Sequence, residues 1–561
     1  MKKLILILMD GMSLEMMKLP ELVDLSFLKK TDLQYIYPEC IKCKDIWKIF
    51  GDISFLDASV DRFRTISSAD QAVMLSSGFS KNYIDLNWDN LDLASRQLFQ
   101  RLNTNSVKIA SLTNMPITDS TVGMFLKANE VNTYNAKKDI SKISYTNINM
   151  QHNIAEQLLN LPWDLLIGGG RMFFYPENME DPVSKGEYGT RTDGLNLLEK
   201  FNKSYVNLLY ENTYSVNKID WSYKKNLVLL NHRDFAFEAE RIPTNAKEPR
   251  LSDLGLDIIY ALNETRQDWI LLLESGKVDP AAHNNNAYYV LGEILEIYRF
   301  LYKLSTRKDW NQYTVIFTSD HATGGLSLCD SYDLPYDGFK QGITWGIGPG
   351  KNRYDRVEYI SKGKKQILDP FTNEYKSKQN FHSQPSALIN SISLHSRDVV
   401  PFLISGPQSY IFKKCQTHAE LYYKILQFYG IQKTPVKKGN LWVVVGNCKN
   451  NDNVCHQLFS DKKYAVINYN AYLLNHLESD EVMDIVMENL MFDCKLLLIN
   501  GDTPVVNCEK LRKQDIHMLE KHALNMQIHI LVMSQEYQNV IRHIESGSTI
   551  KIYKNIDEIP S

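Results

Sequence analysis

The sequence predicts an α/β fold, in which a largely parallel central sheet lies between layers of helices, followed by a smaller C-terminal α/β domain. Short apolar runs alternate with helical patterns such as residues 287–304, and strands that are apolar throughout are typical of parallel sheets covered on both faces. The apolar content of 44% is that of a globular chain. The length of 561 residues exceeds that of one ordinary domain, so more than one unit is expected.

The predicted strands of the first domain are aliphatic runs bounded by polar or glycine-rich turns. These runs are residues 4–9, 107–112, 165–167, 227–230, 270–273 and 315–318, and a later one includes 400–402. In a parallel α/β sheet, ligands bind at the carboxyl ends of the strands. The residues that follow these runs are therefore the candidates for a functional site.

The pattern changes after residue 407, which we take as the end of the first domain. Residues 408–440 contain one helical stretch and a turn-rich segment, and are predicted to form a linker. Further apolar runs alternate with helical segments over 441–561; they are residues 441–445, 465–468, 496–499 and 528–532. We expect a small α/β domain there, with a docking role. Its first run leads into Gly446 without a following Gly-Lys-Ser/Thr, so a phosphate-binding P-loop is excluded.

Charge and cysteine content limit the function classes. The net charge of −3 gives no general attraction to nucleic acid, so any RNA contact would be local. The eight cysteines suggest no disulfide framework, as expected for a reducing compartment. The apolar run at 4–9 is too short for a signal peptide, and no run approaches the ~20 residues of a membrane span. We expect a soluble, intracellular protein with no membrane partner.

Acidic and histidine side chains follow the predicted strands. They are Asp10 after the first strand, Glu274, Asp279 and His283 after the fifth, Asp320 and His321 after the sixth, and His395 before the last. Mixed carboxylate and imidazole ligands suit zinc, manganese and related divalent ions. Each residue alone has an ordinary structural explanation; Asp279 before Pro280, for example, fits a helix N-terminus. Their joint position at one sheet edge predicts a metal site.

A candidate nucleophile lies at the start of a helical stretch. Ser67 and Ser68 precede the sequence Ala-Asp-Gln-Ala-Val-Met-Leu. A helix N-terminus offers free N–H groups and a positive dipole end, which suit a phosphoryl group. Serine is also a common N-cap, so this feature gains weight only beside the predicted metal ligands.

Five motifs, in order along residues 1–407, resemble those of the alkaline phosphatase superfamily. They are ISSADQAVMLSSG, WDLLIGGGRMFFYP followed by GTRTDG, LLESGKVDPAAH, FTSDHATGG and HSRDVVPFLISGP, the last being most similar to the phosphomutase branch. The resemblance implies an alkaline-phosphatase-like α/β sandwich and a metal-dependent phosphohydrolase. It makes Ser68 the nucleophile that attacks phosphorus.

The resemblance also implies two zinc-like sites and one magnesium-like site, in which magnesium or manganese are alternatives. The three sites would be formed by Asp279, His283 and His395, by Asp10, Asp320 and His321, and by Asp10 and Glu274. Two such ions clamp the attacking and leaving oxygens of an in-line displacement. Asp119 is the possible extra ligand of the third site.

The sequence departs from the family pattern around the phosphate. Ser67 replaces the aspartate that precedes the nucleophile, and Glu130 falls where the phosphate-binding arginine is expected. A planar guanidinium fork for two phosphate oxygens would therefore be missing. The candidate substitutes for it are Lys277, Arg171 and Arg397.

The whole chain resembles the minor core proteins of cypoviruses, which are turreted double-stranded RNA viruses of insects. That resemblance implies an NTPase or RNA 5′-triphosphatase acting as cofactor of the viral RNA-dependent RNA polymerase. The implied partners are the polymerase, viral RNA, NTP and the inner capsid shell protein. The implied location is the interior of the virion core, and the host cytoplasm during infection.

Two other hypotheses remain open. A catalytically weak phosphatase fold could act as a scaffold that binds nucleotide, RNA or polymerase, and the departures at Ser67 and Glu130 favour it. A general phosphomonoesterase or phosphodiesterase is the third possibility. The fold alone does not choose among them, because one fold hosts many functions.

Overall fold

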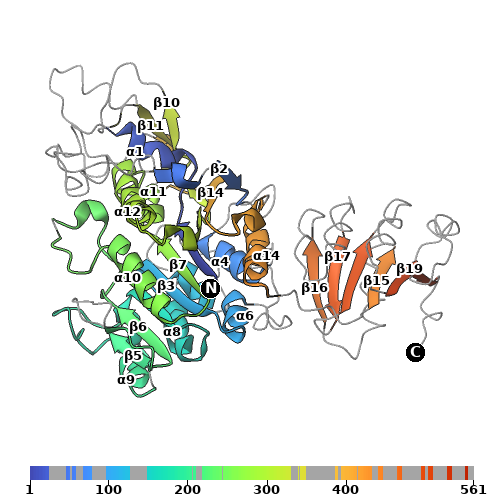
Figure 1. Ribbon diagram of the computed structural model, residues 1–561, viewed down its shortest axis with the longest axis horizontal. Coiled ribbons are helices and arrows are strands. Elements are labelled where there is room, and N and C mark those ends of the chain that lie inside the picture. The colour runs from blue at the N-terminus through green and yellow to red at the C-terminus, as the bar shows by residue number, and fades with distance from the viewer. Residues whose placement is uncertain are drawn as a thin grey trace. The chain divides into compact units, whose positions relative to one another are not determined.

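The computed structural model describes most of the first four-fifths of the chain and the strands of the remainder (Figure 1). The described residues are 1–23, 46–50, 53–58, 67–78, 97–126, 148–204, 206–209, 218–242, 244–329, 339, 341–348, 386–389, 393–413, 415–431, 440–445, 464–469, 494–499, 503–508, 527–532 and 550–553. Two compact units result. The first comprises residues 1–76, 98–128 and 135–429, and the second 77–97, 129–134 and 430–561.

A nine-stranded sheet forms the centre of the first unit. In spatial order its strands are β2 (Ile53–Leu56), β14 (Val400–Ser405), β8 (Thr314–Thr318), β1 (Lys3–Met9), β7 (Trp269–Ser275), β3 (Lys108–Pro116), β4 (Leu165–Gly169), β6 (Lys225–Leu229) and β5 (Val206–Leu209). All neighbouring pairs from β8 to β5 are parallel, and only β14 runs antiparallel to its neighbours. The predicted fold class and all the predicted strands of this sheet are confirmed.

Helices cover the sheet on both faces (Figure 1). The longest, α12 (Ala287–Ser305), packs with α10 (Leu251–Glu264) on one face, and α6 (Leu98–Thr104) and α14 (His418–Tyr429) lie on the other. Shorter helices are α1 (Leu19–Leu22), α4 (Ser68–Ser77), α7 (Ser120–Leu126), α8 (Ile148–Gln157), α9 (Leu197–Asn202) and α11 (Val278–His283). No helix of the described residues is long and apolar enough to cross a membrane.

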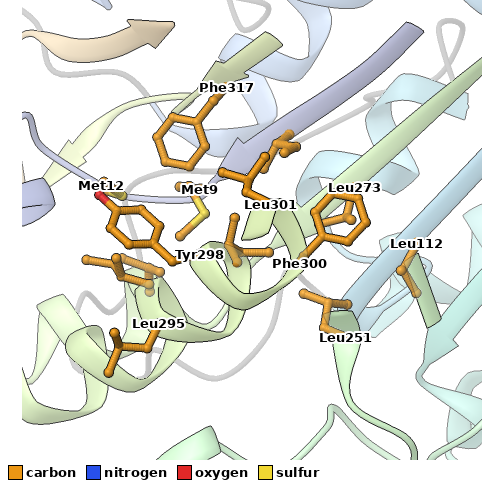
Figure 2. Close-up of a cluster of buried hydrophobic side chains, with 14 of the residues drawn as sticks. Met9, Met12, Leu112, Leu251, Leu273, Leu295, Tyr298, Phe300, Leu301 and Phe317 are labelled. Carbon is orange, nitrogen blue, oxygen red and sulfur yellow. The ribbon is translucent and has the colours of Figure 1, made fainter. Parts of the chain in front are cut away.

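The core on the α10–α12 face is built from alternate residues of the strands (Figure 2). Met9 of β1 and Leu273 of β7 point toward α12, where Phe300 and Leu301 are buried against them. Each fully buried side chain of this size contributes roughly 1.5–3 kcal/mol. Gly255 of α10 permits the close approach, because a Cβ there would lie 2.8 Å from the Phe300 ring.

Two small sheets lie beyond the main one. The first contains β10 (Ser327–Cys329), β11 (Gly342–Gly348) and β12 (Ser386–Ile389). The second pairs β9 (Ala322–Thr323) with β13 (His395–Ser396) in antiparallel register, which places His395 opposite Thr323. This short pairing brings a residue from late in the sequence next to the end of β8.

The first unit extends further than the sequence predicted. Residues 408–440 were expected to form a linker with one helix, and that helix, α14, belongs to the first unit. Its apolar residues Leu421, Tyr422 and Ile425 are buried, and the Tyr429 hydroxyl donates to the Trp269 carbonyl of β7 at 2.5 Å. The helix therefore completes the core of the first unit, and the boundary lies after Tyr429.

The second unit contains a six-stranded sheet. In spatial order its strands are β16 (Tyr464–Tyr469), β17 (Cys494–Ile499), β18 (Thr503–Cys508), β15 (Asn440–Val445), β19 (Gln527–Val532) and β20 (Ile550–Tyr553). The strands β18, β15, β19 and β20 are parallel, and β17 is antiparallel to both its neighbours. The four predicted strands are present, whereas β18 and β20 were not predicted. The predicted helical segments between them lie outside the described residues.

Candidate active site

Three adjacent parallel strands bring the first ligand candidates together. β1 lies between β7 and β8, with Leu8 in register with both Glu274 and Thr318. Asp10 therefore follows β1 at the edge where Asp320 follows β8, and the Gly11 amide donates to Asp320 Oδ1 at 3.0 Å. Gly11 has φ +76°, and a Cβ on it would lie 2.7 Å from Asp279. Glycine is required here because the backbone turns against Asp279.

Asp279, His283 and His395 form one candidate metal site. Asp279 and His283 lie one turn apart on α11, with Oδ2 and Nε2 3.1 Å apart. His395 Nε2 lies 3.8 Å from Asp279 Oδ1, and one donor atom from each residue lies within 4.8 Å of the others. His283 Nδ1 donates to the Ser393 carbonyl at 2.7 Å. This bond fixes the tautomer that leaves the Nε2 lone pair for a cation.

Charge interactions in this group favour an ionised carboxylate. Burial alone would raise the pKa of Asp279, but the adjacent His283, followed by His395 and His321, holds that pKa well below its usual range. The Thr323 hydroxyl also lies 2.5 Å from Asp279 Oδ1. Asp279 is therefore an anionic ligand candidate.

Asp10, Asp320 and His321 form a second group. His321 Nε2 lies 3.5 Å from Asp10 Oδ1 and 3.4 Å from Asp320 Oδ2. The two candidate sites touch, because Asp279 also lies within 4.8 Å of Asp10 and His321 and the His321 and His395 rings stack at 3.8 Å. Ligand groups this close suit the paired cations of two-metal sites.

The second group contains buried carboxylates whose negative charge is not balanced by hydrogen bonds, and a cation would balance it. Asp320 Oδ1 accepts hydrogen bonds from the Gly11 and His321 amides, whereas the buried Oδ2 accepts no hydrogen bond. Burial, and then the Asp320 and Asp279 charges, raise the pKa of Asp10 well above its usual range. Buried carboxylates that repel one another are expected where metal ions supply the positive charge. The residues therefore fit divalent cations.

Ser68 lies at the junction of these groups. It is the first residue of α4, and its Oγ is 2.9 Å from His321 Nε2 and 3.2 Å from Asp10 Oδ1. Ser68 is largely buried, and the helix N-terminus supplies N–H groups to any anion in front of it. The sequence alone showed only a serine at a helix start, and the family resemblance made Ser68 the expected nucleophile. The structure adds its contacts with two ligand candidates.

Glu274 forms a third group with two hydroxyl residues that sequence reasoning missed. The Thr113 hydroxyl donates to Glu274 Oε2 at 2.5 Å. Thr121 lies beside the same carboxyl, and its buried hydroxyl makes no well-formed hydrogen bond. Burial raises the pKa of Glu274 to about 7, which a magnesium-like ion would lower. The signal that could have identified Thr121 was its position two residues after the candidate ligand Asp119.

Asp119 lies close enough to act on this carboxyl. Its charge contributes to the raised pKa of Glu274, and its Oδ1 accepts from the Ser120 amide at 2.9 Å at the start of α7. Both a helix-capping role and the predicted role as third-site ligand fit this position.

The three candidate phosphate-binding cations differ in their surroundings. Arg171 is completely buried, is paired with Asp181 at 2.8 Å and donates to the Leu229 carbonyl at 2.7 Å. Lys277 is buried, is paired with Asp234 and lies 3.9 Å from the centroid of the Phe237 ring. Both charges are thus paired with carboxylates, and substrate binding by Arg171 or Lys277 stays a prediction.

Arg397 differs from the other two. It is exposed and lies two residues after His395. It is the candidate among the three whose position leaves it accessible to a substrate. Glu130, at the position of the expected arginine, lies outside the described residues.

Comparisons with known proteins show which family the chain resembles. A family model described as alkaline phosphatase matches residues 97–427. The human tissue-nonspecific alkaline phosphatase is 25% identical over 231 residues, which cover 36% of this chain and 41% of that protein. The membrane-bound alkaline phosphatase of Bombyx mori is 28% identical over 214 residues, covering 36% and 38%. The chain thus spans less than half the length of these two relatives.

Solved structures show the same fold. The alkaline phosphatase of the Antarctic bacterium TAB5 superposes with a TM-score of 0.50 at 17% identity, over 77% of this chain and 98% of that one. That of Thermus thermophilus gives 0.51 at 16% identity, over 77% and 92%. The family match covers more than half of the sequence and includes Glu274, Asp279, His283, Asp320, His321 and His395. The chain therefore belongs to the alkaline phosphatase family.

Proposed function

We propose that this protein hydrolyses phosphate esters with Ser68 as the nucleophile. The observation that supports this most directly is the position of Ser68 Oγ, within 3.2 Å of both His321 Nε2 and Asp10 Oδ1 at a helix N-terminus. A serine held only as a helix cap would not need contacts with two buried metal-ligand candidates. The general phosphomonoesterase is the function that the family match supports best.

The chemistry follows from the positions of these groups. Ser68 Oγ forms a bond to phosphorus, the bond to the leaving oxygen breaks, and water then cleaves the phosphoseryl intermediate to release phosphate. The first amides of α4 would be available to the phosphoryl oxygens, because a helix N-terminus leaves its first N–H groups without intrahelical partners. Divalent cations held by the carboxylates and histidines would activate the nucleophile and neutralise the leaving oxygen.

The narrower role as an NTPase or RNA 5′-triphosphatase rests on the whole-chain resemblance alone. One feature of the chain is compatible with it: Glu130 stands where the phosphate-binding arginine is expected, and the candidate substitutes Arg171 and Lys277 are both paired with carboxylates. A triphosphate offers further oxygens that other groups could hold. The polymerase, RNA and capsid partners, and a location in a virion core, stay predictions.

The test is phosphate release by the purified protein with zinc, magnesium or manganese. The substrates are p-nitrophenyl phosphate, ATP and 5′-triphosphorylated RNA, and the variants are Asp320→Ala and, as an exposed control, Asp220→Ala. We expect activity that Asp320→Ala abolishes and Asp220→Ala preserves. Hydrolysis of p-nitrophenyl phosphate would identify a general phosphomonoesterase, and hydrolysis of triphosphates alone the narrower role. Absence of activity on all three would favour a scaffold.

A further inference from the structure

A buried histidine outside all the recognised motifs contacts the turn that carries Asp320 and His321. His418 is the first residue of α14 and is completely buried. Its Nε2 lies 2.7 Å from the Ser319 carbonyl oxygen. Because a carbonyl can only accept, the Nε2–H donates, and this fixes the tautomer. Burial lowers the pKa of His418, so the ring is the neutral donor.

The start of α14 is itself held in place. The Thr417 hydroxyl accepts from the Glu420 amide at 3.2 Å, and the Glu420 carboxylate accepts from the Gln416 amide at 2.6 Å. This is close to the reciprocal arrangement of a capping box. His418 is thus presented from a fixed helix end and not from a mobile loop.

Ser319 connects the ends of β8 and β1. Its hydroxyl donates to the Met9 carbonyl, accepts from the Met12 amide at 2.9 Å and lies 2.7 Å from the His321 carbonyl. The same turn orients Asp320. Its Oδ1 accepts hydrogen bonds from backbone amides, and its Oδ2 lies 3.4 Å from His321 Nε2. The geometry of the second metal group therefore depends on where the Ser319 peptide is held.

We infer that His418 is a positioning residue for the second metal group, acting through Ser319 on Asp320 and His321. This rests on the proposed function, because it concerns the same site. A bond from α14 restrains the Ser319 carbonyl, whose other polar contact is the longer one from the Thr318 hydroxyl at 3.3 Å. Removing a group that hydrogen-bonds to a metal ligand and orients it typically lowers metal affinity by about 10–100-fold.

The alternative is that His418 only fills the core. The two readings differ in a measurable way. If His418 only fills the core, its replacement should destabilise the metal-free fold, and metal affinity should fall no more than that loss of stability explains. A positioning residue would weaken metal binding beyond the loss of stability, and a side chain that keeps the donor would restore binding.

The experiment uses the full-length chain, freed of metal with a chelator and titrated with cobalt(II). Cobalt absorption reports ligand geometry without any need for catalysis. The variants are His418→Leu, which removes the donor, His418→Gln, which keeps an N–H near the same place, and Ile425→Ala, a matched control buried on the same helix. Melting temperatures in chelator measure the fold.

We expect His418→Leu to weaken one class of cobalt site about tenfold or more and to change its spectrum. We expect His418→Gln to retain most of the affinity, and Ile425→Ala to lower the melting temperature while keeping the cobalt affinity. Equal affinity in His418→Leu and wild type, or equal weakening in Ile425→Ala, would overturn the positioning role while leaving the proposed function standing. A wild-type chain that binds no cobalt and hydrolyses nothing would overturn both.

Discussion

At the scale of single residues, the site depends on polar side chains that the protein backbone holds in place while one oxygen faces the candidate metal ligands. Asp320 shows this most clearly: its Oδ1 accepts two backbone amides, and its buried Oδ2 accepts none. Ser68 is placed similarly, with its backbone in α4 and its hydroxyl between Asp10 and His321. Such residues are costly to bury without a cation, which is why we interpret them as functional and not structural.

Replacing Ser68 with alanine tests covalent catalysis. We expect Ser68→Ala to lower kcat by ~10³-fold or more, within the range known for the loss of an activated serine nucleophile. Ser76→Ala, near the far end of the same helix, is the matched control and should retain activity. The measurement is steady-state phosphate release. If Ser68→Ala kept substantial activity, water and not the serine would be the attacking group.

Thr121 tests the third group. We expect Thr121→Val, which keeps the shape and removes the hydroxyl, to raise the magnesium concentration needed for half-maximal activity. The reason is that a buried oxygen beside Glu274 would be lost as a ligand. Thr104→Val, on an exposed helix end, is the comparison. Unchanged magnesium dependence would show that Thr121 is not a ligand and would leave Glu274 and Asp119 as the ligand candidates of the third group.

At the scale of elements, buried carboxylates connect α12 to the loops around the site. Glu293 accepts from Asn114 Nδ2 at 3.1 Å and from the Glu238 amide at 2.9 Å, while Asn114 Oδ1 accepts from the Gly276 amide at 2.8 Å. Gly276 lies between Glu274 and Asp279 in the sequence. The helix therefore supports the turn that carries two ligand candidates.

This network predicts a pH dependence of stability. Burial raises the pKa of Glu293 to about 7 from 4.5, so the folded state binds a proton more tightly than the unfolded state. The stabilisation is complete below about pH 4.5 and is lost as the pH rises through about 7. In chelator, we expect Glu293→Gln to reduce this fall by about 1–3 kcal/mol between pH 5 and 8 in urea unfolding.

The slope with pH, and not the absolute stability, is diagnostic, because the amide also changes the bond to Asn114. Glu15→Gln, at an exposed position, serves as the control and should keep the wild-type slope. A Glu293→Gln variant with the full wild-type slope would assign the pH dependence to the other buried carboxyls.

At the scale of the whole molecule, every ligand candidate lies in the first unit. We expect removal of residues 430–561 to leave phosphate release and its metal dependence largely unchanged. If the predicted polymerase association exists, the truncation should weaken it in a pull-down more than it weakens hydrolysis. Lost hydrolysis together with a normal melting transition would show that the second unit contributes to the site.

The sequence by itself determined the fold class and the position of most ligand candidates. Apolar runs predict strands because burial on both faces of a parallel sheet requires continuous hydrophobicity, and ligands at strand ends then meet at one edge. The edge strand β5 was missed because its residues 206–209 include Asn207 and are only partly buried. In the second unit, β18 begins with Thr503 and Pro504, which read locally as a turn.

Only the tertiary structure decided how charged and buried polar groups are paired. Arg171 and Lys277 were candidate phosphate ligands in the sequence, which gave no sign that they pair with Asp181 and Asp234. His418 showed no local signal, since its partner Ser319 is 99 residues away in the sequence. Periodicity records which face of an element is apolar. Hydrogen bonds and ion pairs depend on distances that are set only when the strands and helices have packed.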